Sequence, residues 1–75
     1  MALQYTLFRT SVNPGDIVVC YGVYGFRQSK MPARVLADED MHRPARKGFA
    51  WVREIHSKGK GYEAFTVEWP IGHME

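Results

Sequence analysis

The 75-residue chain has only one cysteine, and it has no long apolar run. Cys20 has no partner within the chain for a disulfide, which excludes a small secreted scaffold held together by disulfides. No segment approaches the roughly 18 apolar residues that a membrane-spanning helix needs. The first ten residues carry no charged segment followed by an apolar stretch, so we expect no signal peptide and a cytoplasmic protein without a membrane partner.

The sequence also lacks the motifs that catalysis and cofactor binding usually need. No phosphate-binding glycine loop, dinucleotide fingerprint or zinc-ligand spacing occurs in it. Cys20 lies among apolar and aromatic residues, with no glycine-rich turn to expose a nucleophile, so we predict a buried packing residue. The run from Asp38 to His42 lacks the alternate spacing of a calcium loop and is interpreted as solvated. We therefore expect no enzymatic activity, no cofactor and no metal site.

Helical periodicity is missing as well, and apolar residues alternate with a period of two, which is typical of strands. The segment "NPGD" at 13–16 predicts a turn, with Gly15 free to take a positive φ. Five short strands are too few for a two-layer sandwich, so we predict one all-β domain over residues 1–75, folded as a small, partly open five-stranded barrel. A short flexible tail is expected after about residue 70. The predicted strands are 3–8, 17–24, 32–37, 48–56 and 62–69, and the predicted core is Val18, Val35, Phe65, Val67 and Trp69.

Two segments, "PGDIVVCYGVYGF" and "MPARV", carry a resemblance to a known family. They are similar to the first barrel strands of PWWP and related Tudor-type domains, which read Gly-Asp-Leu-Val, then Gly-Tyr or Gly-Phe, then Trp-Pro-Ala-Arg-Val. The resemblance spans Gly15 to Val35 and implies an SH3-like barrel. Lys30 and Met31 replace the aromatic pair of that family, so no methyl-lysine cage is implied. The barrels of bacterial endoribonuclease toxins have a similar Gly-Asp-Ile-Val opening.

Charge is unevenly distributed along the chain. The segment from Arg27 to Lys60 holds nine basic and four acidic residues, for a net charge of +5, whereas the rest holds one basic and four acidic residues. Such polarity can steer an anionic partner towards one face. Tyr24 and Phe26 precede the basic loop Arg27 to Lys30, and we expect a second basic loop to converge with it on one binding rim. That second loop contains Arg43, Arg46 and Lys47.

Two phases are open for the strand 48–56. If the small residues Ala50 and Val52 pack inward, then Phe49, Trp51 and Arg53 face outward and offer aromatic and basic binding groups. In the opposite phase, the two large aromatic residues fill the core of a small barrel. A similar alternative applies to Tyr24 and Phe26, which would then complete the core rather than line the rim.

We therefore predict a non-enzymatic binding module that engages a macromolecule. The partner is a protein or a nucleic acid, and a homodimer is a third option. Small chains of this kind are often carried by phages or mobile elements, where they inhibit or adapt host machinery. The alternative is a small ribonuclease, similar to those toxins, in which Arg34, His42 or His56 acts on phosphate. The predicted binding residues are Tyr24, Phe26, Arg27, Lys30, Arg43, Arg46, Lys47, Trp51 and Arg53.

Overall fold

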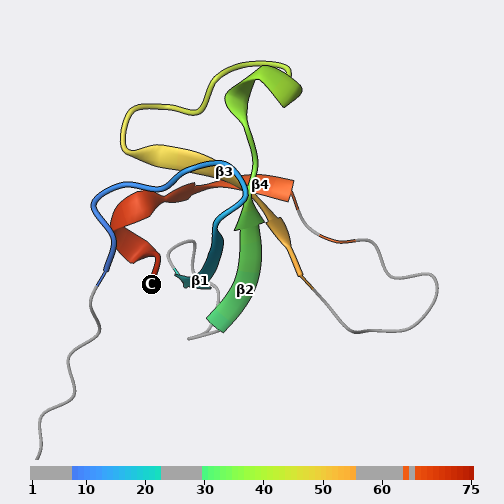
Figure 1. The fold of residues 1–75 in the computed structure, drawn as a ribbon. Coiled ribbons are helices and arrows are strands. Elements are labelled where there is room, and N and C mark those ends of the chain that lie inside the picture. The colour runs from blue at the N-terminus through green and yellow to red at the C-terminus, as the bar shows by residue number, and fades with distance from the viewer. Residues whose placement is uncertain (1–7, 23–29, 56–63, 65) are drawn as a thin grey trace, which may run out of the picture.

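The computed structural model describes residues 8–22, 30–55, 64 and 66–75. Within these ranges the fold is all-β, as predicted, and contains no α-helix. Four strands form one antiparallel open sheet in the order β1-β2-β3-β4 (Figure 1). The strands are β1 (Ile17–Tyr21), β2 (Lys30–Val35), β3 (Phe49–Glu54) and β4 (Thr66–Pro70), and the 3₁₀ turns are η1 (Asp38–Asp40) and η2 (Ile71–His73).

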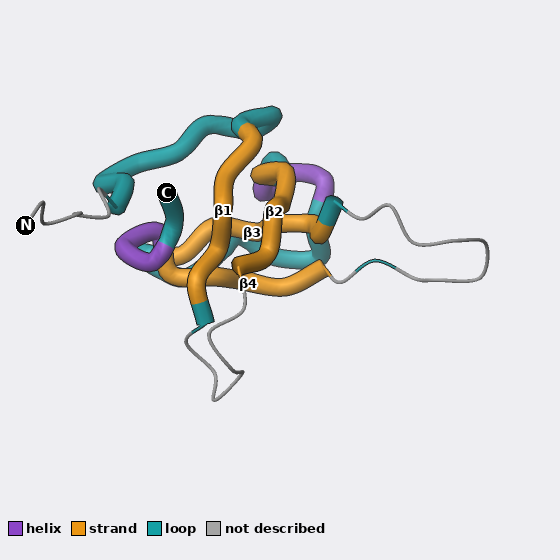
Figure 2. The backbone as a smooth tube through the Cα atoms, turned by 90° about the horizontal axis from the view of Figure 1, so that it is seen from below, coloured by secondary structure: helices purple, strands orange, loops and turns teal. Residues whose placement is uncertain are grey.

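The described sheet therefore has four strands, whereas the sequence predicts a five-stranded barrel. Each of the last four predicted strands overlaps one of the observed strands. The first predicted strand, 3–8, lies outside the described residues except for Phe8, which is not in a strand. The sheet is strongly curved, so that β1 and β2 cross over β3 and β4 (Figure 2). This curvature lets a four-stranded sheet enclose a core between its two halves.

Pro32 is the third residue of β2, because the strand begins at Lys30. The sequence instead predicts a strand that begins at Pro32. Its carbonyl accepts a hydrogen bond from the Ile55 backbone N–H at 2.9 Å. The missing N–H of the proline falls opposite Ile55, one residue beyond the end of β3 at Glu54. The lost hydrogen bond is therefore at the end of the ladder, where it costs least.

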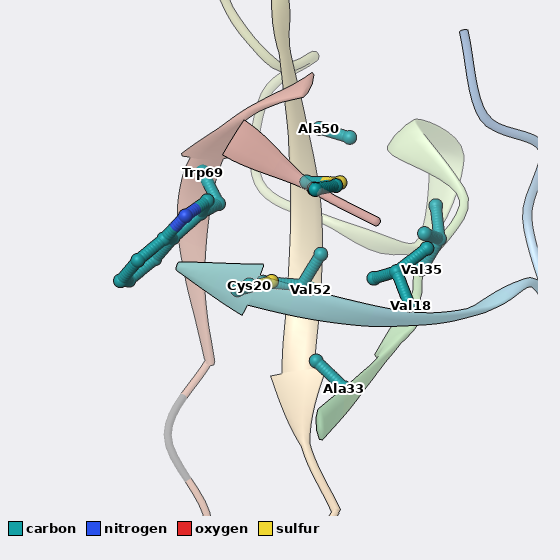
Figure 3. Close-up of a cluster of buried hydrophobic side chains, with 8 residues drawn as sticks. Val18, Cys20, Ala33, Val35, Ala50, Val52 and Trp69 are labelled. Atoms are coloured by element: carbon teal, nitrogen blue, oxygen red, sulfur yellow. The ribbon is translucent and has the colours of Figure 1, made fainter. Parts of the chain in front are cut away.

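The inward face of the sheet carries a compact apolar core (Figure 3). Val18, Val35 and Trp69 are buried there, as predicted, and Val67 packs against them while partly exposed. Phe65 lies outside the described residues. Cys20 is fully buried, which confirms its predicted packing, and burial raises the pKa of its thiol to about 11. The buried cluster consists of Val18, Cys20, Ala33, Val35, Ala50, Val52, Trp69 and Met74.

Residues 71–75 form an ordered part of the fold, which differs from the flexible tail that the sequence predicts. Met74 is completely buried, and the backbones of Val19 and Glu75 exchange two hydrogen bonds of 2.9 and 3.0 Å. The indole N–H of Trp69 also donates to the carbonyl of Tyr21 at 3.0 Å. The end of the described chain therefore runs along β1, because burying a long apolar side chain outweighs the entropy of a free tail.

The predicted turn at 13–16 is confirmed. Asp16 N–H donates to the Asn13 carbonyl at 3.1 Å, and the Asp16 carboxylate accepts from Asn13 N–H at 2.9 Å. Gly15 has a φ of 92°, a left-handed conformation that side chains disfavour. Gly48, just before β3, has a φ of 83° and lies in the same left-handed region. These two glycines fix the entry of the chain into β1 and β3.

Candidate functional site

The phase of β3 determines which residues are available for binding. Ala50 and Val52 belong to the buried core, so Phe49, Trp51 and Arg53 lie on the opposite, outward face. This is the first of the two phases that the sequence leaves open. Trp51 is nevertheless only 6% exposed, because it lies beneath the loop that precedes β3. The first phase predicts an exposed Trp51 and the second predicts a Trp51 in the core, whereas Trp51 is buried on the outward face.

The loop 41–48 contacts Trp51 through its backbone and its side chains. The indole N–H of Trp51 donates to the carbonyl of Arg43 at 3.0 Å, and the Arg43 guanidinium lies 5.0 Å from the centre of the indole ring. The imidazole of His42 packs edge-on against the same ring, with 5.4 Å between the two ring centres. A cation over an aromatic face is stabilised by the ring quadrupole. Trp51 therefore acts as the platform on which the basic loop rests.

Glu68 anchors the loop electrostatically. It lies directly opposite Trp51 in the β3–β4 register, and only 6% of its surface is exposed. Its carboxylate accepts hydrogen bonds from the Arg43 guanidinium and, at 2.7 Å, from the backbone N–H of Arg46. These bonds, the Arg43 bond foremost, hold the pKa of Glu68 at about 2, well below its usual value. The carboxylate is thus ionised and compensated at neutral pH.

Arg46 adds a second cation–aromatic contact. Its guanidinium lies 4.1 Å from the centre of the Phe49 ring, and its Nε lies 3.5 Å from the Glu68 carboxylate. The side chains of Arg43 and Arg46 remain 44% and 59% exposed. Both guanidinium groups therefore keep surface that a ligand can reach, while their positions are fixed from below by an aromatic ring and a carboxylate.

A second pair of arginines lies further along the sheet. Arg34 of β2 is directly opposite Arg53 of β3, and both are exposed. Arg53 also donates to the Thr66 hydroxyl of β4 at 3.1 Å. This bond directs the Arg53 guanidinium towards β4, on the side of β3 away from β2. We call the surface formed by Arg34, Arg43, Arg46, Lys47 and Arg53, with Phe49 and Trp51 beneath, the arginine face.

The structure brings together only part of the predicted site. Arg43, Arg46, Trp51 and Arg53 lie on β3 or on the loop before it, with Lys47 in the same loop. Lys30 is at the opposite end of β2, six residues or about 20 Å of extended chain from Leu36, which pairs with Trp51. Lys30 therefore does not share a rim with the basic loop and instead lies 6.0 Å from the Tyr21 ring. The other three predicted residues, Tyr24, Phe26 and Arg27, lie outside the described residues.

Sequence reasoning missed two members of this surface as binding residues. Glu68 alternates with the inward-facing Val67 and Trp69, as any solvated strand residue does, so no local signal marks it as a partner of the basic loop. Arg34 was considered only as a group that acts on phosphate. Its proximity to Arg53 depends on the β2–β3 register, which no local pattern reveals.

Comparisons with protein-family models, with curated proteins and with solved structures find no match to this chain. Within the described ranges, no three His, Cys, Asp or Glu side chains gather in a way that could hold a metal ion. Nor does the part of the chain that the structure describes include a helix long and apolar enough to cross a membrane. A function for the arginine face is therefore argued from its own geometry and charge.

Proposed function

We propose that the protein is a non-enzymatic binding module whose arginine face binds single-stranded nucleic acid. The observation that carries this proposal is the stacking of Arg46 on Phe49, at 4.1 Å, with most of the Arg46 side chain exposed. Guanidinium planes stack on unpaired bases as aromatic rings do. A base placed over Arg46 would extend a stack that begins in the sheet.

The charge of the surface supports the same proposal. The arginine face has five cations, and its one buried carboxylate, Glu68, is already paired with two of them. Arg34 and Arg53 occupy opposed positions on β2 and β3, and rotation of the Arg53 side chain away from Thr66 would bring both guanidinium groups within reach of one phosphate. Arginine suits phosphate better than lysine does because its donors are planar. A phosphate placed there would be held by two guanidinium groups.

A nucleic acid fits this surface better than a protein partner does. Protein interfaces are usually centred on an accessible aromatic anchor, and Trp is the foremost of these. Trp51 is only 6% exposed and is covered by the loop 41–48, so it cannot enter a pocket of a partner. What the surface exposes is guanidinium groups, which attract a phosphate backbone.

The complete fold that we propose remains a small five-stranded barrel. It is supported by the strong curvature of the sheet in Figure 2 and by the pairing of Val19 with Glu75, which adds a second neighbour along β1. Barrels of this size commonly display a binding surface on their outer strands and loops. The arginine face lies on such outer positions.

The experiment that tests the proposal is fluorescence anisotropy with a labelled oligothymidine of about 15 nucleotides, near the upper site size of small barrels. We expect saturable binding that the double change Arg34→Ala and Arg53→Ala weakens by about tenfold or more. Lys30→Ala is the matched control, because it removes an exposed cation at the far end of β2. No binding, or equal losses from both variants, would contradict the proposal.

A further inference from the structure

A pocket of about 310 Å³ adjoins the arginine face, and the proposed function does not use its interior. Its walls come from the segment before β1, from the end of β2 with η1, from the start of β3 and from η2. Val12, Leu36, Phe49 and Ile71 give it an apolar lining, and Val35 and Ala50 of the core also contribute. Its volume lies near the lower end of the range of about 300–1,000 Å³ that is typical of ligand sites.

The polar groups at this pocket all have the same sign. Asp38 and Glu39 of η1 line it and are exposed, and no basic side chain is among its lining residues. Asp38 is held in place because its carboxylate accepts the backbone N–H of Ala45 at 3.3 Å. An apolar interior with an acidic edge attracts an apolar group that carries a positive charge beside it and repels phosphate.

The pocket also touches the arginine face. Phe49 lines it, and the guanidinium of Arg46 lies over the ring of the same residue. Two surfaces of opposite charge therefore meet at one aromatic side chain. The acidic edge disfavours a phosphate-bearing ligand of the arginine face, so a ligand of the pocket would have a different chemistry.

We propose that this pocket is a docking site for a peptide segment of another protein, in which an apolar side chain is followed by lysine or arginine. The apolar side chain would displace water from the surface formed by Val12, Leu36 and Ile71. The cation would lie against Asp38 and Glu39. The binding module would then join a basic protein segment to a nucleic acid through two adjacent sites.

The test is a titration of the ¹⁵N-labelled protein with the capped pentapeptide Gly-Leu-Lys-Arg-Gly, followed by NMR. We expect saturable shifts of the amide signals of Leu36, Ala37, Asp38 and Glu39. Two matched peptides, one with Ser in place of Leu and one with Glu-Glu in place of Lys-Arg, should each bind about fivefold more weakly or worse. Absence of saturable shifts, or shifts confined to the arginine face, would overturn the proposal.

Protein variants locate the site independently of the peptides. The double change Asp38→Asn and Glu39→Gln keeps the size of both side chains and should weaken the pentapeptide by about fivefold. Asp40→Asn is the matched control, because Asp40 lies in the same turn without lining the pocket. Equal losses would show a general charge effect and refute the site. Pocket shifts that depend on protein concentration alone would assign it to a second copy of the chain, which also refutes the proposal.

The same samples keep this proposal separate from the proposed function. The Asp38→Asn and Glu39→Gln variant should bind oligothymidine at least as tightly as the parent, since it removes only negative charge. Loss of pentapeptide binding with retained oligothymidine binding therefore concerns the pocket alone. Loss of oligothymidine binding in the parent would overturn the proposed function and leave the pocket result unaffected.

Discussion

Trp51 and Arg43 are joined twice, once by the hydrogen bond from the indole N–H to the arginine carbonyl and once by the guanidinium that lies over the indole ring. The first contact fixes the backbone of the loop 41–48, and the second fixes the side chain. Glu68 completes the arrangement from the neighbouring strand. A buried tryptophan outside the apolar core thus holds a basic loop in one place, which would lower the entropy cost of the binding that we propose.

Changing Trp51 to Phe should destabilise the protein and weaken oligothymidine binding. The phenyl ring cannot donate to the Arg43 carbonyl, and we expect a loss of about 1–3 kcal/mol in the free energy of unfolding. Trp69→Phe is the matched control, since it loses the bond to the Tyr21 carbonyl in the core. Urea unfolding should show similar losses for both, whereas anisotropy should show weaker binding only for Trp51→Phe. Unchanged binding in Trp51→Phe would contradict the claim that Trp51 positions the loop 41–48 for binding.

Acid should release the anchor of the basic loop. Because the pKa of Glu68 is lowered from 4.5 to about 2, its contribution to stability is fully present above pH 4.5 and is lost as the pH falls to about 2. The free energy of unfolding of the parent should therefore fall in this interval by more than that of Glu68→Gln. Chemical unfolding measured at several pH values checks this. Parallel curves for the two proteins would show that the fold does not lower the pKa of Glu68.

The two glycines with positive φ should not tolerate alanine. Gly15→Ala and Gly48→Ala should each cost about 1 kcal/mol, and the cause is backbone strain, because an added Cβ meets no atom within 4 Å at either position. Gly72→Ala is the control, since it is equally uncrowded and has no positive φ. Thermal unfolding should place this control at or above the parent. Equal losses at all three positions would contradict the strain argument.

The Cys20 thiol should react very slowly in the native protein. It is completely buried, and burial raises its pKa to about 11, so little thiolate exists at neutral pH. A thiol reagent should therefore label the protein rapidly only after unfolding. Cys20→Ala should leave oligothymidine binding intact while it lowers stability slightly. Fast labelling of the native state, or lost binding in a folded variant, would reverse the interpretation of this residue as packing.

The strands from residue 17 onward and half of the buried cluster were predictable because they depend on local patterns. Alternation along "FAWVREI" places Ala50 and Val52 on one face, and the turn at 13–16 needs only the residue types that it contains. The burial of Cys20 was equally predictable, because its neighbours in the sequence are apolar and aromatic. Met74 was not, because its burial depends on a long-range pairing with Cys20 that leaves no mark in the residues around it.

The site was predictable in its components and not in its assembly. Arg43, Arg46, Trp51 and Arg53 were identified from residue type, yet the covering of Trp51 by its own loop was not. That contact depends on a backbone carbonyl and on Glu68, which lies in another strand. The separation of Lys30 from this group likewise follows from strand direction and register. Physical contacts between distant segments are the part that local patterns do not carry.

The central claim is that exposed arginines on the outward face bind a phosphate backbone, and the salt dependence of oligothymidine binding tests it most directly. Each neutralised phosphate on a single strand contributes about −0.7 to the slope of log affinity against log salt concentration. With three to five such contacts the slope should lie between about −2 and −3.5. It should become about 1.4 less steep in the Arg34→Ala and Arg53→Ala variant. A flat response, or an unchanged slope in that variant, would contradict the account.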